Sequence, residues 1–315
     1  MKNKVLKTLS SIALIALILG TSIFIITKFA NNKNSARIIS SNFIGYDFAR
    51  AVTGDKSEIS MLLKPGAEAH DFEPTPEDII NIKNADLFIY VGGKSDEWIE
   101  NLLEDNEIPA EKTLRLMDLV EVKEEELSEG MEDHSHEDHE EYDEHIWTSP
   151  LNAIQLVNGI KTKLSTIHPE NKSTYIQNAD SYTSHLLAID QKIRGVVSSS
   201  AKKELIFGDR FPFRYFVDEY DLGYYAAFPG CSEQTEASSQ TIAFLIDKAK
   251  TDNIKTILKI ELTSDKLAKT IAEEAGAKVL TLNAAHNISK EDFESGLTYA
   301  DIMETNIDVL KEALK

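Results

Sequence analysis

The histidines are the residues of this sequence whose type and spacing could support chemistry, and that chemistry is metal binding. Of the eight, four fall within twelve positions of an acidic run: His134, His136, His139 and His145. Neutral imidazole is the commonest metal ligand in proteins, and flanking carboxylates favour an incoming divalent cation. The run therefore predicts metal binding rather than an acidic loop with incidental histidines. Its first three histidines lie in a stretch without apolar periodicity, residues 121–144, which indicates a mobile loop and hence only a weak capture site.

A second group of candidate ligands stands where predicted strands end or where the chain becomes ordered again. The group consists of His70, His145, His286, Asp209 and Glu236. Ligands of open α/β sheets bind beyond the carboxyl ends of the strands, so this joint placement favours one shared cleft over isolated, hydrogen-bonded loop residues. His168 and His185 lie in a helical stretch and are interpreted as structural or surface residues.

The elements that would position these residues alternate between strands and helices. Short apolar runs predict strands at 38–40, 59–63, 87–91, 204–207, 224–228, 254–260 and 278–282. A helix is expected to begin at Thr75-Pro76, with Thr75 as N-cap and Pro76 as first residue. Further helices are expected at 173–197, 211–220, 238–250, 264–275 and 299–314. Ser238 and Ser264 are the expected caps of two of them. This alternation predicts an α/β fold of two lobes with parallel sheets. The sequence predicts helix throughout residues 150–200. The helix at 173–197, of some 25 residues, would be about 37 Å long, which is enough to bridge the lobes.

The domain boundaries follow from this pattern. We expect an N-terminal signal or anchor at 1–34, a first lobe at 35–150 that carries the acidic loop, a helical connector at 151–200 and a second lobe at 201–315.

The composition excludes several classes of protein. A net charge of −20, from 53 acidic and 33 basic side chains, repels nucleic acid and draws cations to the surface. Cys231 is the only cysteine of the 315-residue chain, so a thiolate cage or an intrachain disulfide is impossible. Any metal site must therefore use imidazole and carboxylate.

The N-terminus resembles a secretory or anchor segment. Lys2, Lys4 and Lys7 precede an apolar run from Ile12 to Ile26. The small-residue pattern of a cleavage site is poor, and no cysteine follows the run for lipid attachment, so we favour an uncleaved membrane anchor over a cleaved signal peptide. In either case the rest of the chain is expected outside the cytoplasm.

Several motifs together resemble the solute-binding proteins of zinc and manganese ABC transporters, the ZnuA/TroA-like group. The first-lobe motif runs from Pro65-Gly66 through His70 to Pro74-Thr75-Pro76, and Asp143-x-His145-Ile146-Trp147 resembles the second ligand segment. Matches in the second lobe start at Phe213 and at Tyr299, so the resemblance covers nearly everything after Arg37. It implies two Rossmann-like lobes, a rigid linking helix and a metal cleft between the lobes. Many zinc members carry a similar acidic, histidine-rich loop.

The resemblance implies that His70 and His145 are the first-lobe ligands, whereas the second lobe departs from the pattern. Arg210 stands where the family usually has His or Glu, and the usual later Asp falls near Asn283. Arginine stays protonated and cannot coordinate a metal. We therefore expect His286, then Glu236 and then Asp209, as replacements. Glu68 is a further candidate, as ligand or as support for a histidine ring nitrogen.

These observations predict metal capture rather than catalysis. The expected cargo is Zn²⁺, with Mn²⁺ or nickel as alternatives, bound as the lobes close slightly and delivered to an ABC permease and its ATPase. A secreted metallohydrolase is disfavoured because neither a His-Glu-x-x-His nor a Gly-x-Ser-x-Gly motif occurs. A surface adhesin of the same fold is the remaining alternative.

Overall fold

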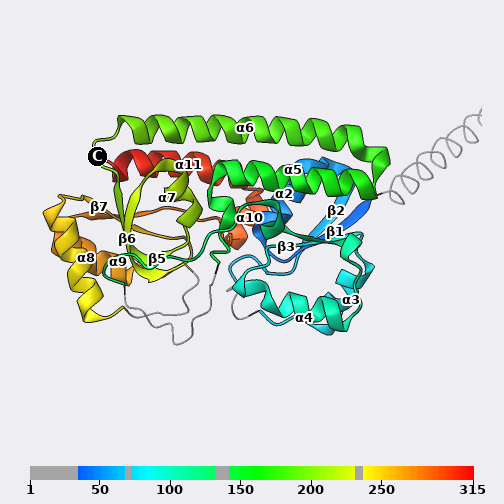
Figure 1. Ribbon diagram of the computed structural model, residues 1–315, viewed down its shortest axis with the longest axis horizontal. Coiled ribbons are helices and arrows are strands. Elements are labelled where there is room, and N and C mark those ends of the chain that lie inside the picture. The colour runs from blue at the N-terminus through cyan, green and yellow to red at the C-terminus, as the bar shows by residue number, and fades with distance from the viewer. Residues whose placement is uncertain (1–34, 68–71, 132–141, 231–236) are drawn as a thin grey trace, which may run out of the picture.

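Two four-stranded parallel sheets organise the chain (Figure 1). The computed structural model describes residues 35–67, 72–131, 142–230 and 237–315. The strand orders are β2-β1-β3-β4 in the first sheet and β6-β5-β7-β8 in the second, and every neighbouring pair is parallel. This arrangement confirms the predicted α/β class with a parallel sheet in each lobe.

The first lobe is built on an apolar central strand. The strands are β1 (Ala36–Ser40), β2 (Ser57–Met61), β3 (Leu87–Tyr90) and β4 (Thr113–Arg115). All four residues of β3 are buried, as expected for a parallel strand covered on both faces. The helices are α2 (Phe43–Thr53), α3 (Pro76–Asn84) and α4 (Glu97–Asp105). The helix start predicted at Thr75 is confirmed, since Thr75 and Asp78 form a capping box.

The second lobe repeats the scheme. Its strands are β5 (Glu204–Phe211), β6 (Gly223–Pro229), β7 (Thr256–Lys259) and β8 (Lys278–Thr281). Its helices are α7 (Arg214–Tyr220), α8 (Ser239–Thr251), α9 (Lys266–Ala275), α10 (Lys290–Ser295) and α11 (Tyr299–Ala313). Ser238 caps α8 as predicted, whereas the N-cap of α9 is Asp265 and not Ser264.

Strand β5 is longer than its sequence indicates. We expected the strand to end at Phe207 and a helix to begin at 211, but pairing with β6 resumes at Arg210 and Phe211 after an irregularity in register. Asp209 therefore lies within β5 and not after it. The reason is tertiary, because the extension is made by pairing with β6. The carboxylate of Asp209 accepts the backbone N–H of Ile260, just beyond β7, at 3.1 Å.

Long helices join the two lobes. Helix α5 (Pro150–Ile167) is followed by α6 (Lys172–Ser199), whose 28 residues give a length of about 42 Å. Figure 1 shows α6 spanning both lobes, with α5 and α11 beneath it. One continuous core cluster includes Phe48 of the first lobe, Tyr175 of α6 and Phe207 of the second lobe. The lobes therefore share buried packing and do not meet only at a linker.

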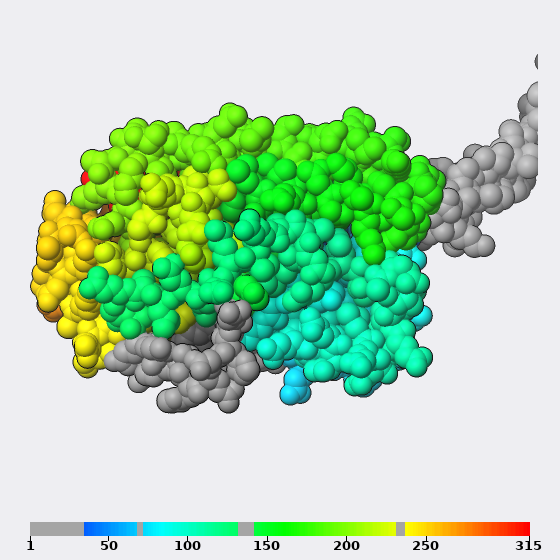
Figure 2. Space-filling view, viewed as in Figure 1, coloured from blue at the N-terminus to red at the C-terminus, as the bar shows by residue number. Residues whose placement is uncertain are grey.

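The described part of the acidic loop, residues 121–131, crosses to the second lobe (Figure 2). Lys123 forms an ion pair with Asp218 at 2.6 Å, and Glu126 pairs with Arg214 at 3.1 Å. Tyr224 also donates a hydrogen bond to the carbonyl of Glu126. This part of the loop is thus bound to the second lobe.

In the portion of the chain that the structure describes, no helix has both the length and the apolar character needed to cross a bilayer. The apolar N-terminal run lies outside that portion.

Candidate metal site

Three ligand-type side chains converge where the two lobes meet. Glu144 and His145 come from the segment that precedes α5, and His286 comes from the loop after β8. One donor atom of each lies within 4.8 Å of the other two. Donors that share a tetrahedral Zn²⁺ at about 2.1 Å are about 3.4 Å apart, so the spacing of this group is of the order that coordination requires. It is the only such group among the described residues.

Asp143 fixes the orientation of the His145 imidazole. The side chain of His145 is completely buried, and Nδ1 lies 3.0 Å from Asp143 Oδ1, which also accepts the backbone N–H of His145 at 2.7 Å. With Nδ1 protonated and donated to the carboxylate, the lone pair of the ring is on Nε2. That atom is buried and has no hydrogen-bond partner among the described residues. A carboxylate–imidazole pair with a free second nitrogen is the usual arrangement of a zinc-binding histidine.

The carboxylates around His145 shift the pKa of its imidazole. Burial lowers the pKa of the imidazole, but the charge and hydrogen bond of Asp143, together with the charges of Glu144 and Glu125, outweigh burial, so the pKa lies above its ordinary value. The same negative field that retains a proton favours a divalent cation, which would replace that proton.

Glu144 is held in place by the first lobe. Its Oε2 accepts the backbone N–H of Ser95 at 2.9 Å, and its Oε1 accepts the Ser95 hydroxyl at 2.5 Å. The carboxylate packs so closely on Gly93 that a Cβ there would lie 2.4 Å from Oε2. Since only glycine fits at residue 93, the backbone itself makes room for a buried carboxylate next to His145.

His286 is carried by a loop that the second lobe fixes. Glu261 accepts the backbone N–H groups of Ala284 and His286 at 2.7 and 2.8 Å, one on each carboxylate oxygen. Burial raises the pKa of Glu261, although these backbone donors oppose the shift. Ala285 has a left-handed backbone, φ 55°, which turns the chain just before His286. The imidazole is half-buried, and its ring centroid lies 5.1 Å from that of His145.

The other second-lobe candidates are arranged differently. Oxygens of Asp209 accept hydrogen bonds from the backbone of Ile260, from the Thr263 hydroxyl and from the Arg210 backbone, and Asp209 is not part of the three-residue group. Arg210 lines the same cleft pocket as Glu261 and His286. A permanent positive charge therefore lies where the resemblance leads us to expect a ligand.

Six of the predicted site residues lie outside the described residues. They are Glu68, His70, His134, His136, His139 and Glu236. Of the predicted cleft ligands, the structure brings His145 and His286 together.

Two carboxylates at this site, Glu144 and Glu261, were not predicted from the sequence. Glu144 is adjacent to His145, and this position could have identified it as a ligand. It also belongs to a run of acidic residues, however, and nothing in the sequence separates it from the others. Glu261 follows β7 at its carboxyl end, the same kind of place that identified the other candidates.

A two-lobed α/β binding protein is the class that this fold and cleft define. Residues 38–313 match the family described as "Zinc-uptake complex component A periplasmic", ZnuA, and the chain belongs to that family. Membership confirms the expectation of an extracytoplasmic solute-binding component of zinc uptake rather than an enzyme.

Individual relatives agree with this assignment. The chain is 34% identical over 280 residues to the high-affinity zinc uptake system protein ZnuA of Bacillus subtilis, covering 88% of this chain and 87% of that protein. It is 32% identical to the zinc-binding lipoprotein AdcA of Streptococcus pneumoniae, covering 87% of this chain and 55% of that protein, about half its length. The Zn(II)-bound ZnuA-like domain of S. pneumoniae AdcA superposes with a TM-score of 0.74 at 29% identity, over 89% of this chain and 99% of that one.

Proposed function

We propose that this protein captures Zn²⁺ in the cleft between its lobes, with His145 and His286 as imidazole ligands and Glu144 as carboxylate ligand. The single observation that carries the proposal is the buried Nε2 of His145, which has no hydrogen-bond partner in the described structure while Nδ1 is bound to Asp143. A buried polar atom without a partner is costly, and a metal ion would satisfy it.

His70 is the fourth ligand in this proposal. The residues on either side of 68–71 support it: Ala67 lines a cleft pocket with His286, and Phe72 lines a second pocket with His286 and Glu144. Asn287 also donates a hydrogen bond to the carbonyl of Ala67. The chain therefore enters and leaves this segment beside the site. Glu68 would support a histidine ring, and Glu236 is the reserve ligand from the second lobe.

The donor set favours zinc. Two or three imidazoles with one carboxylate suit tetrahedral Zn²⁺, whereas Mn²⁺ prefers oxygen ligands. The names of the relatives from B. subtilis and S. pneumoniae also refer to zinc.

Delivery completes the proposed function. The loaded protein passes Zn²⁺ to an ABC permease driven by its ATPase, and residues 1–34 tether it to the membrane at the extracytoplasmic face. His134, His136 and His139 act as a collecting site that raises the local concentration of zinc.

The test is a titration of the protein with Zn²⁺ and with Mn²⁺ in a calorimeter. We expect one tight zinc site, weaker manganese binding and loss of tight zinc binding in His70→Ala. A protein lacking residues 132–141 should retain the tight site. Loss of all zinc binding on that deletion alone would overturn the cleft assignment.

A further inference from the structure

Three consecutive hydrogen bonds cross the boundary between the lobes and end at the metal site. The backbone N–H of Tyr299, the first residue of α11, donates to Asp47 Oδ2 of the first lobe at 3.0 Å. The Tyr299 hydroxyl donates to the carbonyl of Trp147 at 2.7 Å, and the indole N–H of Trp147 donates to the carbonyl of Ala284 at 2.7 Å. We name this chain of Asp47, Tyr299, Trp147 and Ala284 the interlobe tie.

The tie is buried over its whole length. The exposed fraction of each of its four residues is 2% or less. Hydrogen bonds in such surroundings are not weakened by competing water, and opening one would leave buried donors and acceptors unpaired. The tie therefore resists separation of the lobes at this point.

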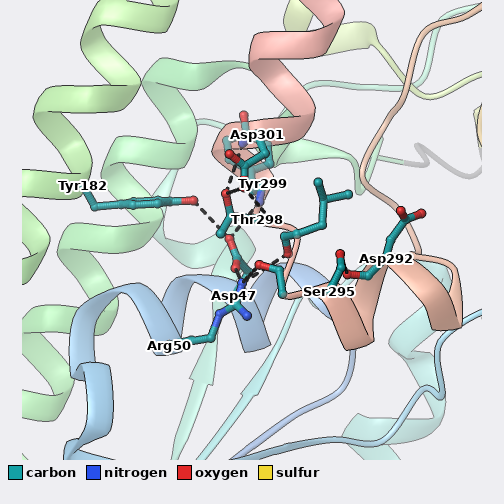
Figure 3. Close-up of polar contacts among 10 residues, drawn as sticks. Asp47, Arg50, Tyr182, Asp292, Ser295, Thr298, Tyr299 and Asp301 are labelled. Carbon is teal, nitrogen blue, oxygen red and sulfur yellow. Dashed lines mark hydrogen bonds and ion pairs between the residues drawn. The ribbon is translucent and has the colours of Figure 1, made fainter.

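Asp47 forms a firm anchor for the tie (Figure 3). Its carboxylate also accepts hydrogen bonds from Arg50 at 2.6 Å and from Tyr182 of α6 at 3.0 Å. Arg50 in turn donates to the carbonyls of Gly296 and Leu297, just before α11. A carboxylate at a helix N-terminus is favourable because the first N–H groups of a helix have no partner within it.

The other end of the tie reaches both imidazoles. Trp147 follows His145 by two residues, and Ala284 precedes His286 by two. The Trp147 ring centroid lies 5.5 Å from that of His145 and 6.1 Å from that of His286. The Trp147 ring thus packs against the histidine of each lobe. Trp147 itself belongs to the first-lobe segment and is hydrogen-bonded to the second lobe twice, through its indole N–H and through its backbone carbonyl.

We propose that Tyr299 and Trp147 are positioning residues for metal capture, which hold His145 and His286 at a fixed separation before the ion arrives. This inference rests on the proposed zinc site. Without the tie, the metal-free protein would populate arrangements in which the two imidazoles are farther apart. The apparent affinity would then fall in proportion to the fraction that remains competent to bind.

The test compares Tyr299→Phe with the unaltered full-length protein. The substitution removes only the hydroxyl and keeps the ring that packs edge-on against Phe48, with centroids 5.1 Å apart. Tyr220→Phe is the matched control, because Tyr220, like Tyr299, is a buried tyrosine whose hydroxyl donates a hydrogen bond. Its acceptor is the buried carboxylate of Asp190, at 3.1 Å, which is not part of the metal site. Zinc affinity is measured by competition with a chelator, and the geometry of the site by the visible absorption of bound Co²⁺.

We expect zinc binding to weaken about tenfold in Tyr299→Phe, which corresponds to about 1.4 kcal/mol. The Co²⁺ spectrum should change as well, while Tyr220→Phe loses stability but keeps both readouts. An unchanged affinity and spectrum in Tyr299→Phe, or equal losses in both variants, would overturn the inference. Failure of the unaltered protein to bind zinc would instead overturn the proposed function, and the role of the tie with it.

Discussion

The two lobes contribute unequally to the candidate metal site. The first-lobe segment of Asp143, Glu144 and His145 is at least 97% buried at every residue, and each polar side chain in it is held by a specific partner. The second lobe contributes His286, which is half-buried, and places Arg210 in the pocket beside it. From this difference we expect the first lobe to carry most of the affinity of the proposed site and the second lobe to close it.

The largest test of this asymmetry compares His145→Ala with His286→Ala. Loss of His145 should weaken zinc binding more than 100-fold, beyond the range of about 10–100-fold that the loss of a supporting residue costs. Loss of His286 should cost less, because its partners in the first lobe remain. Calorimetric titration of both variants checks the order, and a larger loss in His286→Ala would reverse the comparison.

A second test separates a ligand carboxylate from a structural one. Glu144→Gln keeps the shape of the side chain but removes the charge of a proposed ligand, so we expect zinc affinity to fall about 100-fold, at the upper limit of the range of about 10–100-fold for residues that only support a ligand. Asp209→Asn is the matched change in the second lobe. There the free energy of unfolding should fall by about 1–3 kcal/mol, because a buried charge-assisted hydrogen bond is lost.

Denaturant titrations and zinc competition assays on both variants give the two readouts. A loss of affinity in Asp209→Asn equal to that in Glu144→Gln would show that the second lobe also supplies a carboxylate ligand.

A third test would make the second lobe more like the first. Arg210→His replaces a fixed positive charge with a neutral donor in the pocket that holds His286. Zinc affinity should rise about tenfold, which is about 1.4 kcal/mol. Arg210→Ala is the control, since it removes the charge without adding a ligand. If the alanine variant gains as much, the effect is electrostatic and no new ligand has formed.

The smallest effect concerns Asp96, which lines the first-lobe side of the cleft with Glu144. Burial, with a contribution from the charge of Glu144, raises the pKa of Asp96 to about 6, against about 3.9 in the unfolded chain. Between pH 7 and pH 5 the folded protein therefore takes up a proton that the unfolded chain does not. The stabilisation is complete below the unfolded pKa and is lost as the pH rises through about 6.

Relative to Asp96→Asn, the free energy of unfolding of the unaltered protein should increase by about 1 kcal/mol from pH 7 to pH 5. Urea denaturation at the two pH values measures this. If the free energy of unfolding changes equally with pH in the unaltered protein and in Asp96→Asn, the first-lobe side of the cleft does not raise the pKa of Asp96.

The amino-acid sequence by itself determined the alternation of strands and helices and the linking helix, and it singled out His145 and His286, which the structure brings together. These features are local: an apolar run such as Leu87–Tyr90, a cap such as Thr75, or a histidine after a strand can be recognised without the rest of the chain. The family motifs around His145 added the ligand segment on the same basis.

Only the tertiary structure decided which side chains meet. The extension of β5 through Asp209 depends on pairing with β6, and the carboxylate of Asp209 accepts the backbone N–H of Ile260, 51 residues away. The selection of Glu144 from a run of acids depends on Ser95 and Gly93, and the pairing of Trp147 with Tyr299 joins residues 152 positions apart. Such contacts depend on how two lobes pack around a shared core, and no periodicity or spacing along the sequence records that packing.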